Sequence, residues 1–381
     1  MSSFRVDKGI SKFFKAAYEK QKLEEFKDSF FPPDPSVVYF HNSSPQSEKT
    51  PEQYFVNYSK YFANICFSTY PVMNNQKFGK PIADFTQTDV YKNMAIMSIA
   101  DGCGMGSRPA KSAHVACEKF AEYVSSEAVK EKTLGRVLRV MSDAMAYVQC
   151  SILETEETSM DAGLTTFQAV VVLRTDQMTY AVLYISLGDC RGLLVHRSSE
   201  KIEELVEGYV SRVDVKTTGG RLGPVEGDLP ELDNYRCGIR FVHPGTSVLL
   251  MTDGICDNFD IRMFVDKPSE CGLSGNEWLD EDVQHQERRK SEFFSKMVEM
   301  YLEPSLVQLC ENVYDFVVER TQKQRTLKIE ASKTKTKIPA SQSLHGKMDH
   351  STLTVLVLND GLFNRCQVEP LELEVPADMK I

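Results

Sequence analysis

Five aspartates at the ends of strand-like apolar runs constrain the fold of this chain more than any other feature. They are Asp84, Asp101, Asp189, Asp253 and Asp349. Asp101 and Asp253 each close an apolar run and are each followed by glycine, whereas Asp189 follows a glycine at the end of a third run. If these runs are strands of stacked sheets, their carboxylates can converge on one edge of a sandwich.

Each aspartate is a weak signal by itself, because Asp-Gly after a strand is usually a turn. Several such sites in one chain are more informative. Glycine beside aspartate lets the backbone approach a ligand closely, and its carbonyl can bind a cation. Ligands that offer only oxygen suit Mg²⁺ or Mn²⁺ better than zinc.

Composition and charge indicate an ordinary globular protein. The chain has 381 residues, of which 42% are hydrophobic and 26% charged. This length predicts one large domain with extensions, or two domains. The net charge of -10 argues against non-specific nucleic-acid binding.

Cysteine usage and the N-terminus favour a cytoplasmic or nuclear location. The ten cysteines form no CxxC pair, so zinc-ribbon spacing is absent from the sequence and buried, reduced thiols are expected. The first 20 residues lack the apolar core of a signal peptide. No run approaches the roughly 20 apolar residues that cross a bilayer, so no membrane span is predicted.

The order of patterns along the chain predicts an α+β layered fold. Helical spacing at 110–124 and 130–153 precedes strand-like runs. Residues 1–70 are predicted to be a partly helical N-terminal extension, and 361–381 a C-terminal tail. Residues 261–348 are predicted to be a helical and basic insertion into a domain that spans 71–360.

Within that insertion, the basic and Thr/Ser-rich stretch 323–347 predicts a flexible, protease-sensitive loop. The Lys/Arg-rich part, 320–337, has two interpretations: a solvated surface, or a site for a phosphoinositide or an acidic partner.

The motifs at the strand ends resemble those of the metal-dependent protein serine/threonine phosphatases of type 2C, the PPM family. DGCGMG at 101–106 stands where the family has Asp-Gly-His-Gly-Gly, and GLTT at 163–166 resembles its Gly-Ser/Thr-Thr-Ala. LGDCR at 187–191, TDGICD at 252–257 and DHSTL at 349–353 resemble the motifs that follow, in the same order.

This resemblance implies two antiparallel β-sheets packed as a sandwich with helices on both sides, a four-layer αββα fold. It also implies a metal-dependent phosphatase that hydrolyses phosphoserine or phosphothreonine in a phosphoprotein substrate through a metal-activated water. Two Mn²⁺ or Mg²⁺ ions are implied, with a weaker third in some members. The resemblance implies that Asp84 and Asp101 bridge or orient the two ions, with the Gly102 carbonyl as a further ligand, and that Asp253 and Asp349 hold the other metal. Asp189, with Asp253 and Asp257, matches the residues at the third ion.

Several positions depart from the family pattern. Cys103 stands where many members have the histidine proposed to protonate the leaving group, which leaves the proton donor open. Ala83 stands where a glutamate is frequent. The family's phosphate-binding arginine has no clear match; Lys80 and Arg108 are candidates, with ordinary surface charge as the alternative. His350 is expected to serve in hydrogen bonding or packing rather than in catalysis.

Two functional hypotheses remain open at this point. The first is an active phosphoprotein phosphatase, and the second is a catalytically weak type 2C-like domain that acts as a regulatory or binding module. A domain without activity usually lacks one or more of the metal aspartates. Every matched position has aspartate here, which favours the enzyme. The oligomeric state is left open.

Overall fold

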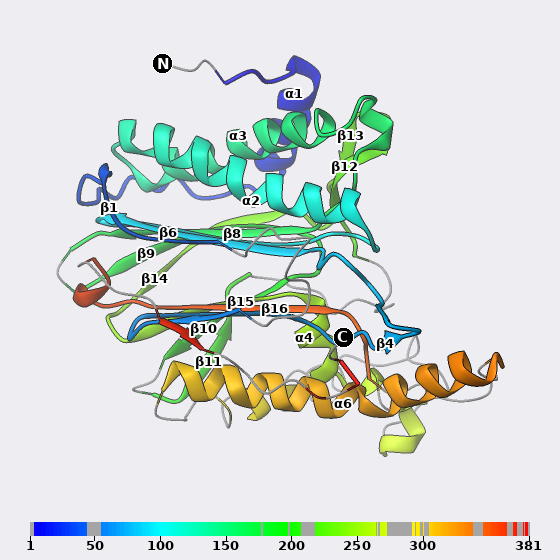
Figure 1. The fold of residues 1–381 in the computed structure, drawn as a ribbon. Coiled ribbons are helices and arrows are strands. Elements are labelled where there is room, and N and C mark those ends of the chain that lie inside the picture. Colours follow the sequence, from blue (N-terminus) through cyan, green and yellow to red (C-terminus); the bar gives the residue numbers. More distant parts are fainter. Residues whose placement is uncertain are drawn as a thin grey trace.

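In the computed structural model, two antiparallel sheets pack face to face and helices cover both outer faces (Figure 1). The structure describes residues 4–43, 55–176, 178–196, 199–206, 218–263, 265, 267–272, 292–293, 295–297, 300, 305–337, 346–363, 369–371, 376 and 378–379. This arrangement confirms the four-layer αββα fold.

The first sheet has six strands and lies under the N-terminal helices. In spatial order its strands are β1 (Asp34–Ser43), β6 (Asp84–Lys92), β7 (Met94–Asp101), β8 (Phe167–Arg174), β9 (Tyr180–Leu187) and β14 (Arg236–Val242). Its outer face is covered by α2 (Ser107–Glu127) and α3 (Leu134–Leu153), and α1 (Lys8–Lys20) packs on α3 (Figure 1).

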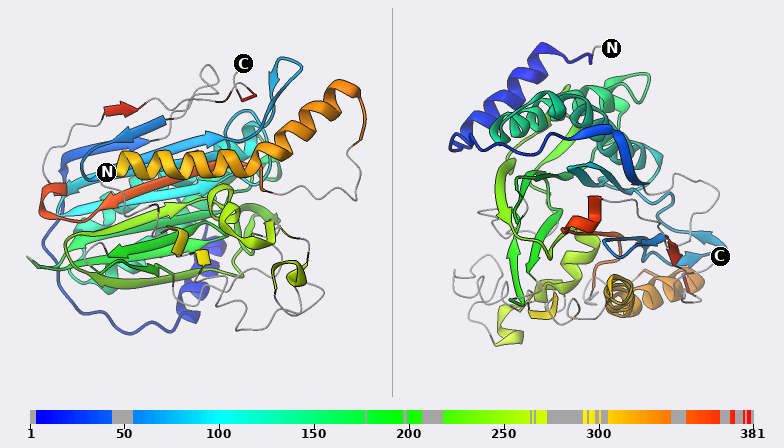
Figure 2. Two further views of the ribbon diagram at one scale, coloured as in Figure 1. Left: turned by 90° about the horizontal axis from the view of Figure 1, so that it is seen from below. Right: turned by 90° about the vertical axis from the view of Figure 1, so that its left-hand side faces the viewer.

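The second sheet has seven strands and is covered by one long helix. In spatial order its strands are β11 (Lys201–Glu204), β10 (Arg191–His196), β15 (Thr246–Met251), β16 (His350–Val357), β3 (Phe62–Ser68), β2 (Phe55–Tyr58) and β17 (Glu369–Leu371). Helix α6 (Leu306–Thr334) runs across its outer face (Figure 2). Two small ribbons pair β12 (Arg221–Glu226) with β13 (Leu229–Glu231), and β4 (Val72–Met73) with β5 (Gln76–Lys77).

Central strands such as β7 are almost entirely apolar because both of their faces are buried. In β7, Met94, Ile96 and Ala100 pack under the helices. The alternate residues Ala95, Met97 and Ile99 pack against the other sheet. Successive strand residues point to opposite faces, so an unbroken apolar run is what a middle layer requires.

Three strands from within the first 70 residues lie in the two sheets, where the sequence analysis predicted an extension outside the domain. Strand β1 pairs with β6 at the edge of the first sheet, and β3 lies between β16 and β2 in the second. Every residue of β3 is buried. Its sequence, FANICFS, shows no alternation because both faces are covered, and it is too short to stand out among loops.

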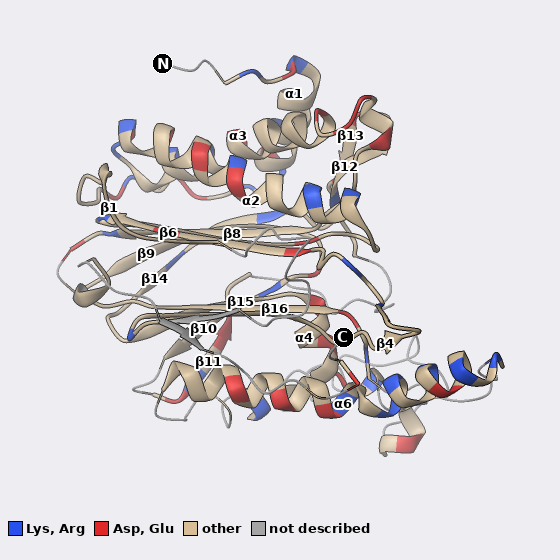
Figure 3. Cartoon of the chain, viewed as in Figure 1, with Lys and Arg blue, Asp and Glu red and all other residues tan. Residues whose placement is uncertain are grey.

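The predicted loop at 323–347 is helical as far as Thr334, which corrects that prediction. Helix α6 begins at the cap residue Ser305 and buries apolar residues at spacings of three and four. Its second half is rich in Lys, Arg, Gln and Glu, which are good helix formers (Figure 3). Residues 338–345 of the predicted loop lie outside the described residues.

Helix α6 forms the fourth layer of the fold, so the segment predicted as an insertion supplies part of the sandwich. Among the described helices, neither α6 nor any other is long and apolar enough to cross a membrane.

Segments of the predicted C-terminal tail are attached to the second sheet and to α6. Strand β17 pairs with β2 at the sheet edge. The guanidinium of Arg325, only 1% exposed, donates to Asp378 Oδ2 at 2.8 Å and to the Val318 carbonyl at 3.0 Å. The Asp378 carbonyl in turn accepts from Val72 N at 3.1 Å. Arg325 therefore joins the helix layer to a segment more than 50 residues away in sequence.

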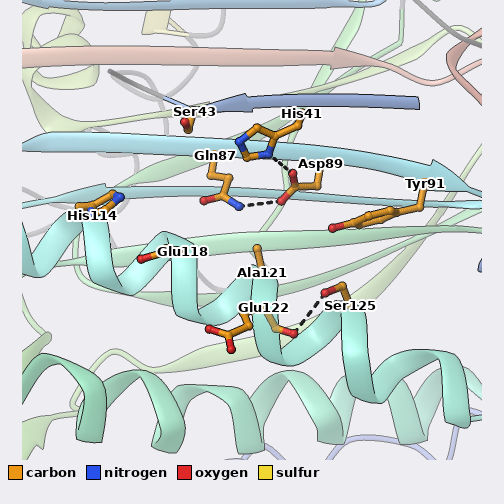
Figure 4. Close-up of a pocket in the computed structure, with 10 residues that line it drawn as sticks. All are labelled: His41, Ser43, Gln87, Asp89, Tyr91, His114, Glu118, Ala121, Glu122 and Ser125. Carbon is orange, nitrogen blue, oxygen red and sulfur yellow. Dashed lines mark hydrogen bonds and ion pairs between the residues drawn. The ribbon is translucent and has the colours of Figure 1, made fainter. Parts of the chain in front are cut away.

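A separate cavity of about 460 Å³ lies between β1, β6 and α2 (Figure 4). His41 on the edge strand β1 forms an ion pair with Asp89 on β6, and Gln87 donates to the same carboxylate at 2.7 Å. His114 and Glu118 line the cavity from the side of α2. The ring of His114 contacts Phe85, with centroids 4.5 Å apart.

We predict that Arg325→Met lowers the free energy of unfolding by about 2 kcal/mol. Removing one partner of a fully buried ion pair lowers the free energy of unfolding by about 3–5 kcal/mol. The loss is smaller here because Asp378 is partly exposed and keeps some hydration. Chemical denaturation measures the difference. Lys333→Met removes an exposed cation from the same helix and serves as the control. Equal denaturation midpoints for the two variants would contradict the role of Arg325.

We predict that the His41–Asp89 pair stabilises the fold at acidic pH only. The hydrogen bond to Asp89 raises the pKa of His41 above its ordinary value of 6.5. Stabilisation by a raised pKa is fully present below the unfolded-state value and is lost as pH rises through the folded-state value. Wild type should therefore melt at a higher temperature than His41→Gln at about pH 6, and at the same temperature at about pH 9. His243→Gln, at an exposed histidine outside the cavity, should show no such pH dependence.

Candidate functional site

Four of the predicted aspartates lie at strand ends, two in each sheet. Asp84 is the first residue of β6 and faces Asp101, the last residue of β7, across the antiparallel pair. In the other sheet, Asp253 follows β15 and starts the short helix α4 (Asp253–Cys256), while Asp349 directly precedes β16. Strands β15 and β16 are antiparallel neighbours, so these two residues also lie at one end of their pair.

Asp189 lies where the chain crosses from one sheet to the other. It stands between β9 in the first sheet and β10 in the second. Gly188 before it has a φ of +102°, and a Cβ there would lie 2.5 Å from the Cβ of Thr166, so only glycine fits this crossing. Carboxylate oxygens of Asp101, Asp189 and Asp253 all lie within 4.8 Å of one another.

The GLTT segment holds the backbone of Asp101 in place. The hydroxyl of Thr165 donates to the Asp101 carbonyl at 2.9 Å, as does the backbone N–H of Thr166. Gly102 donates to the carbonyl of Ala83 at 3.1 Å. A Cβ at Gly102 would lie 2.5 Å from the Pro109 carbonyl oxygen, so the turn after Asp101 requires glycine. The ligand role of the Gly102 carbonyl stays a prediction.

Asp84 is oriented by threonines of the opposite sheet. Its Oδ2 accepts hydrogen bonds from the hydroxyls of Thr252 at 2.8 Å and Thr352 at 2.9 Å. The residue is only 4% exposed, and its Oδ1 is buried without a hydrogen-bond partner in the described part of the chain. A buried carboxylate oxygen without a donor is the kind of atom that a cation satisfies.

Burial and mutual repulsion disfavour the charged forms of these carboxylates. Burial raises the pKa of Asp84 to about 8, although the hydrogen bond from Thr252 opposes the rise. Burial and then the charge of Asp253 raise the pKa of Asp101 well above its ordinary value. Burial likewise raises the pKa of Asp349 to about 6. The cluster therefore has an excess of negative charge that divalent cations would relieve, and its oxygen donors fit Mg²⁺ or Mn²⁺.

Asp349 is anchored by residues next to β3. Its backbone N–H donates to the Thr69 hydroxyl at 2.8 Å, and its carbonyl accepts from Thr69 N at 2.9 Å. The hydroxyl of Tyr70 donates to Asp349 Oδ1 at 3.3 Å. The N-terminal segment thus helps to place a predicted metal ligand.

A lysine that the sequence analysis did not consider lies within the carboxylate cluster. The Lys347 ammonium forms ion pairs with Asp253, with Asp257 Oδ2 at 3.2 Å and with Asp349 Oδ2 at 3.2 Å. Burial opposes the charge of Lys347, yet the three carboxylates raise its pKa well above the ordinary value. The ammonium therefore neutralises part of the cluster on the side of the second sheet.

The two candidate phosphate-binding residues lie in different settings. Arg108, in the first turn of α2, forms an exposed ion pair with Asp161 at 3.0 Å. Lys80 lies in the loop before β6, four residues before Asp84. Their assignment to substrate phosphate stays a prediction.

His350 is a structural residue, as expected. Its Nδ1 accepts from Ala83 N at 3.2 Å, so Nε2 carries the proton and donates to the Gly79 carbonyl at 2.6 Å. Burial lowers the pKa of His350 to about 4. The neutral ring fastens the loop that leads into Asp84.

Cys103 lies in the turn between Asp101 and α2. Burial, followed by the charge of Asp189, raises the pKa of its thiol to about 12. Its backbone N–H donates to the Leu164 carbonyl at 2.8 Å. The shift favours the protonated thiol over the thiolate.

The sequence analysis missed Lys347, Thr252, Thr352 and Thr69. For Lys347 a signal existed: alternate residues of an extended segment point to the same side, so residues 347 and 349 can face one site. The threonines had no comparable signal, because their partners are hundreds of residues away or in the other sheet.

The sequence of the chain is similar to sequences of known proteins. A sequence model described as "Protein phosphatase 2C" matches residues 74–270. The PP2C-like domain-containing protein CG9801 of Drosophila melanogaster is 29% identical over 196 residues, which cover 50% of this chain and 27% of the fly protein. The chain thus spans about a quarter of the length of that relative.

Solved phosphatase structures are more distant. The structure of the S. agalactiae serine/threonine phosphatase has a TM-score of 0.45 at 12% identity. The match covers 78% of this chain and 100% of that one. The Mycobacterium tuberculosis serine/threonine phosphatase PstP/Ppp has a TM-score of 0.44 at 11% identity and covers 80% of this chain and 100% of that one. The sequence match covers more than half of the chain and includes Asp84, Asp101, Asp189 and Asp253, and on that match the chain belongs to the protein phosphatase 2C family.

Proposed function

We propose that this chain is a divalent-cation-dependent phosphatase that acts on phosphoserine and phosphothreonine in proteins. The observation that carries the proposal is the convergence of Asp101, Asp189 and Asp253 within 4.8 Å, in a chain of the phosphatase 2C family. A cytoplasmic or nuclear phosphoprotein is the proposed substrate.

The residues of the chain have distinct roles in this proposal. Asp101, Asp189 and Asp253 hold the cation, and Asp84 offers its free Oδ1 to the same site. Thr252 and Thr352 orient Asp84 by occupying its other oxygen. Bound Mn²⁺ or Mg²⁺ would neutralise phosphoryl oxygens and acidify a water molecule for attack on phosphorus. The carboxylates alone would repel a phosphoryl dianion, so substrate binding depends on filling the site.

A catalytically weak regulatory module is the second candidate function, and two observations favour it. The Lys347 ammonium already pairs with three of the carboxylates, and Cys103 stands where many family members have the histidine proposed as proton donor. In such a module the domain would keep the fold of the family and act in regulation or binding without rapid turnover.

We predict that the purified chain hydrolyses a phosphothreonine peptide with added Mn²⁺ and not after chelation. Asp101→Asn and Asp253→Asn should each lower this activity by at least about 100-fold, because residues that only support a metal ligand already cost up to that much. Asp233→Asn, at an exposed position, is the control and should retain full activity. A wild-type chain without Mn²⁺-dependent turnover would support the regulatory module instead.

We predict that Thr352→Val weakens Mn²⁺ binding by about 10-fold to 100-fold while the fold is retained. Valine has the shape of threonine but cannot donate to Asp84 Oδ2, so the carboxylate loses one of its two orienting bonds. Isothermal titration with Mn²⁺ measures the change. Thr354→Val, two residues further along the same strand and buried, is the matched control, and equal affinities for both variants would rule out an orienting role for Thr352.

A further inference from the structure

Hydrogen bonds with the side chain of Asn258 hold the backbone of Lys347 next to the carboxylate cluster. Its backbone N–H donates to Asn258 Oδ1 at 2.9 Å, and its carbonyl accepts from Asn258 Nδ2 at 2.9 Å. Asn258 is fully buried, and its Nδ2 also donates to the Gly254 carbonyl at 2.8 Å. The segment that carries Lys347 is thereby fastened to the chain directly after Asp253.

The residue before Lys347 also has a constrained backbone. Gly346 has a φ of +82°, and a Cβ there would lie 2.4 Å from the Arg320 carbonyl oxygen. Its N–H donates to the Met263 carbonyl at 2.9 Å. Only glycine fits this turn against α6, and the turn directs the chain into the cluster. The position of Lys347 is therefore determined by packing on both sides of it, and not only by attraction of its charge.

The ammonium and a divalent cation compete for the same oxygens. Lys347 contacts Asp253, Asp257 and Asp349, which are the ligands expected on the side of the second sheet. Two cations at one set of carboxylates would repel each other. Asp101 and Asp189 are close to Asp253, but no ion pair joins them to Lys347 within the described residues. The ammonium of Lys347 therefore occupies the side of Asp257 and Asp349, and it leaves the side of Asp101 and Asp189 to a divalent cation.

We propose that Lys347 is a tethered cation that takes the place of one divalent ion between Asp253 and Asp349. The chain then binds its remaining divalent cation on the side of Asp101 and Asp189. This inference rests on the metal binding assumed in the proposed function, and it predicts one ion fewer than the two that the family resemblance implies.

The test counts Mn²⁺ ions in wild type and in Lys347→Ser. Removing the ammonium frees the oxygens of Asp253, Asp257 and Asp349, so the variant should bind one more Mn²⁺ ion than wild type, measured by elemental analysis of the dialysed protein. Electron paramagnetic resonance should show a spin-coupled Mn²⁺ pair in the variant alone. Lys347→Arg keeps the charge and should bind as wild type does. Lys337→Ser, at an exposed lysine, is the control.

Thermal melting covers the case in which Lys347→Ser folds poorly. Without metal, the variant should melt at a lower temperature than wild type, because three carboxylates lose their counter-ion. On addition of Mn²⁺, the melting temperature of the variant should rise more than that of wild type, because each additional ion bound to the folded state stabilises it. Equal Mn²⁺ counts in wild type and Lys347→Ser, or a spin-coupled pair in wild type, would overturn the inference.

The ion count separates this inference from the proposed function. If Lys347→Ser gains an ion and neither protein hydrolyses phosphopeptide, the inference holds and the phosphatase proposal fails. If wild type is active and already contains two ions, the phosphatase proposal holds and the inference fails.

Discussion

Repulsion among buried carboxylates at one end of the sandwich is the constraint on which the rest of this structure depends. Asp101, Asp189 and Asp253 reach within 4.8 Å of one another, and Asp84 is almost fully buried beside them. Such a cluster is unfavourable unless the backbone holds it and cations or donors compensate it. Many features of the surrounding fold serve one of these two needs.

The backbone holds the cluster by joining the two sheets at this end. Asp189 lies on the crossing from β9 to β10, and Asp84 accepts hydrogen bonds from Thr252 and Thr352 of the opposite sheet. Asp349 is fastened to Thr69 at the end of β3. Because Asp84 and Asp349 are hydrogen-bonded to residues of other strands and loops, the site and the sandwich are stabilised by the same contacts.

Compensation of charge distinguishes this chain from a simple two-ion site. The Lys347 ammonium supplies one positive charge to Asp253, Asp257 and Asp349, where a divalent ion would supply two. The charge of Lys347 is covalently attached to the chain, whereas a bound metal ion exchanges with solvent. The phosphatase and the regulatory proposals therefore differ in how much positive charge reaches a bound phosphoryl group.

Elements with strong local sequence patterns could be predicted, whereas elements that depend on distant partners could not. Strands such as β7, β8 and β15 are apolar and bounded by turn residues, and the Asp-Gly pairs at the ends of β7 and β15 are local signals. Neighbouring residues alone produce these patterns, so the strands and the candidate aspartates could be predicted from them, whereas the sheet sandwich was implied by the family resemblance. The short strand β3 and the basic half of α6 depend on distant partners, so the sequence analysis predicted the first as part of an N-terminal extension and the second as a flexible loop.

The sequence by itself determined the strand pattern, the order of the motifs and the aspartates at the strand ends. Only the tertiary structure decided which oxygens share a site. Thr352 reaches Asp84 from a position 268 residues away, and Lys347 meets Asp253 only because β15 and β16 pair and Asn258 fastens the intervening chain. Hydrogen bonds and ion pairs of this kind depend on distances of about 3 Å between atoms that folding alone brings together, and such distances leave no periodic trace in the sequence.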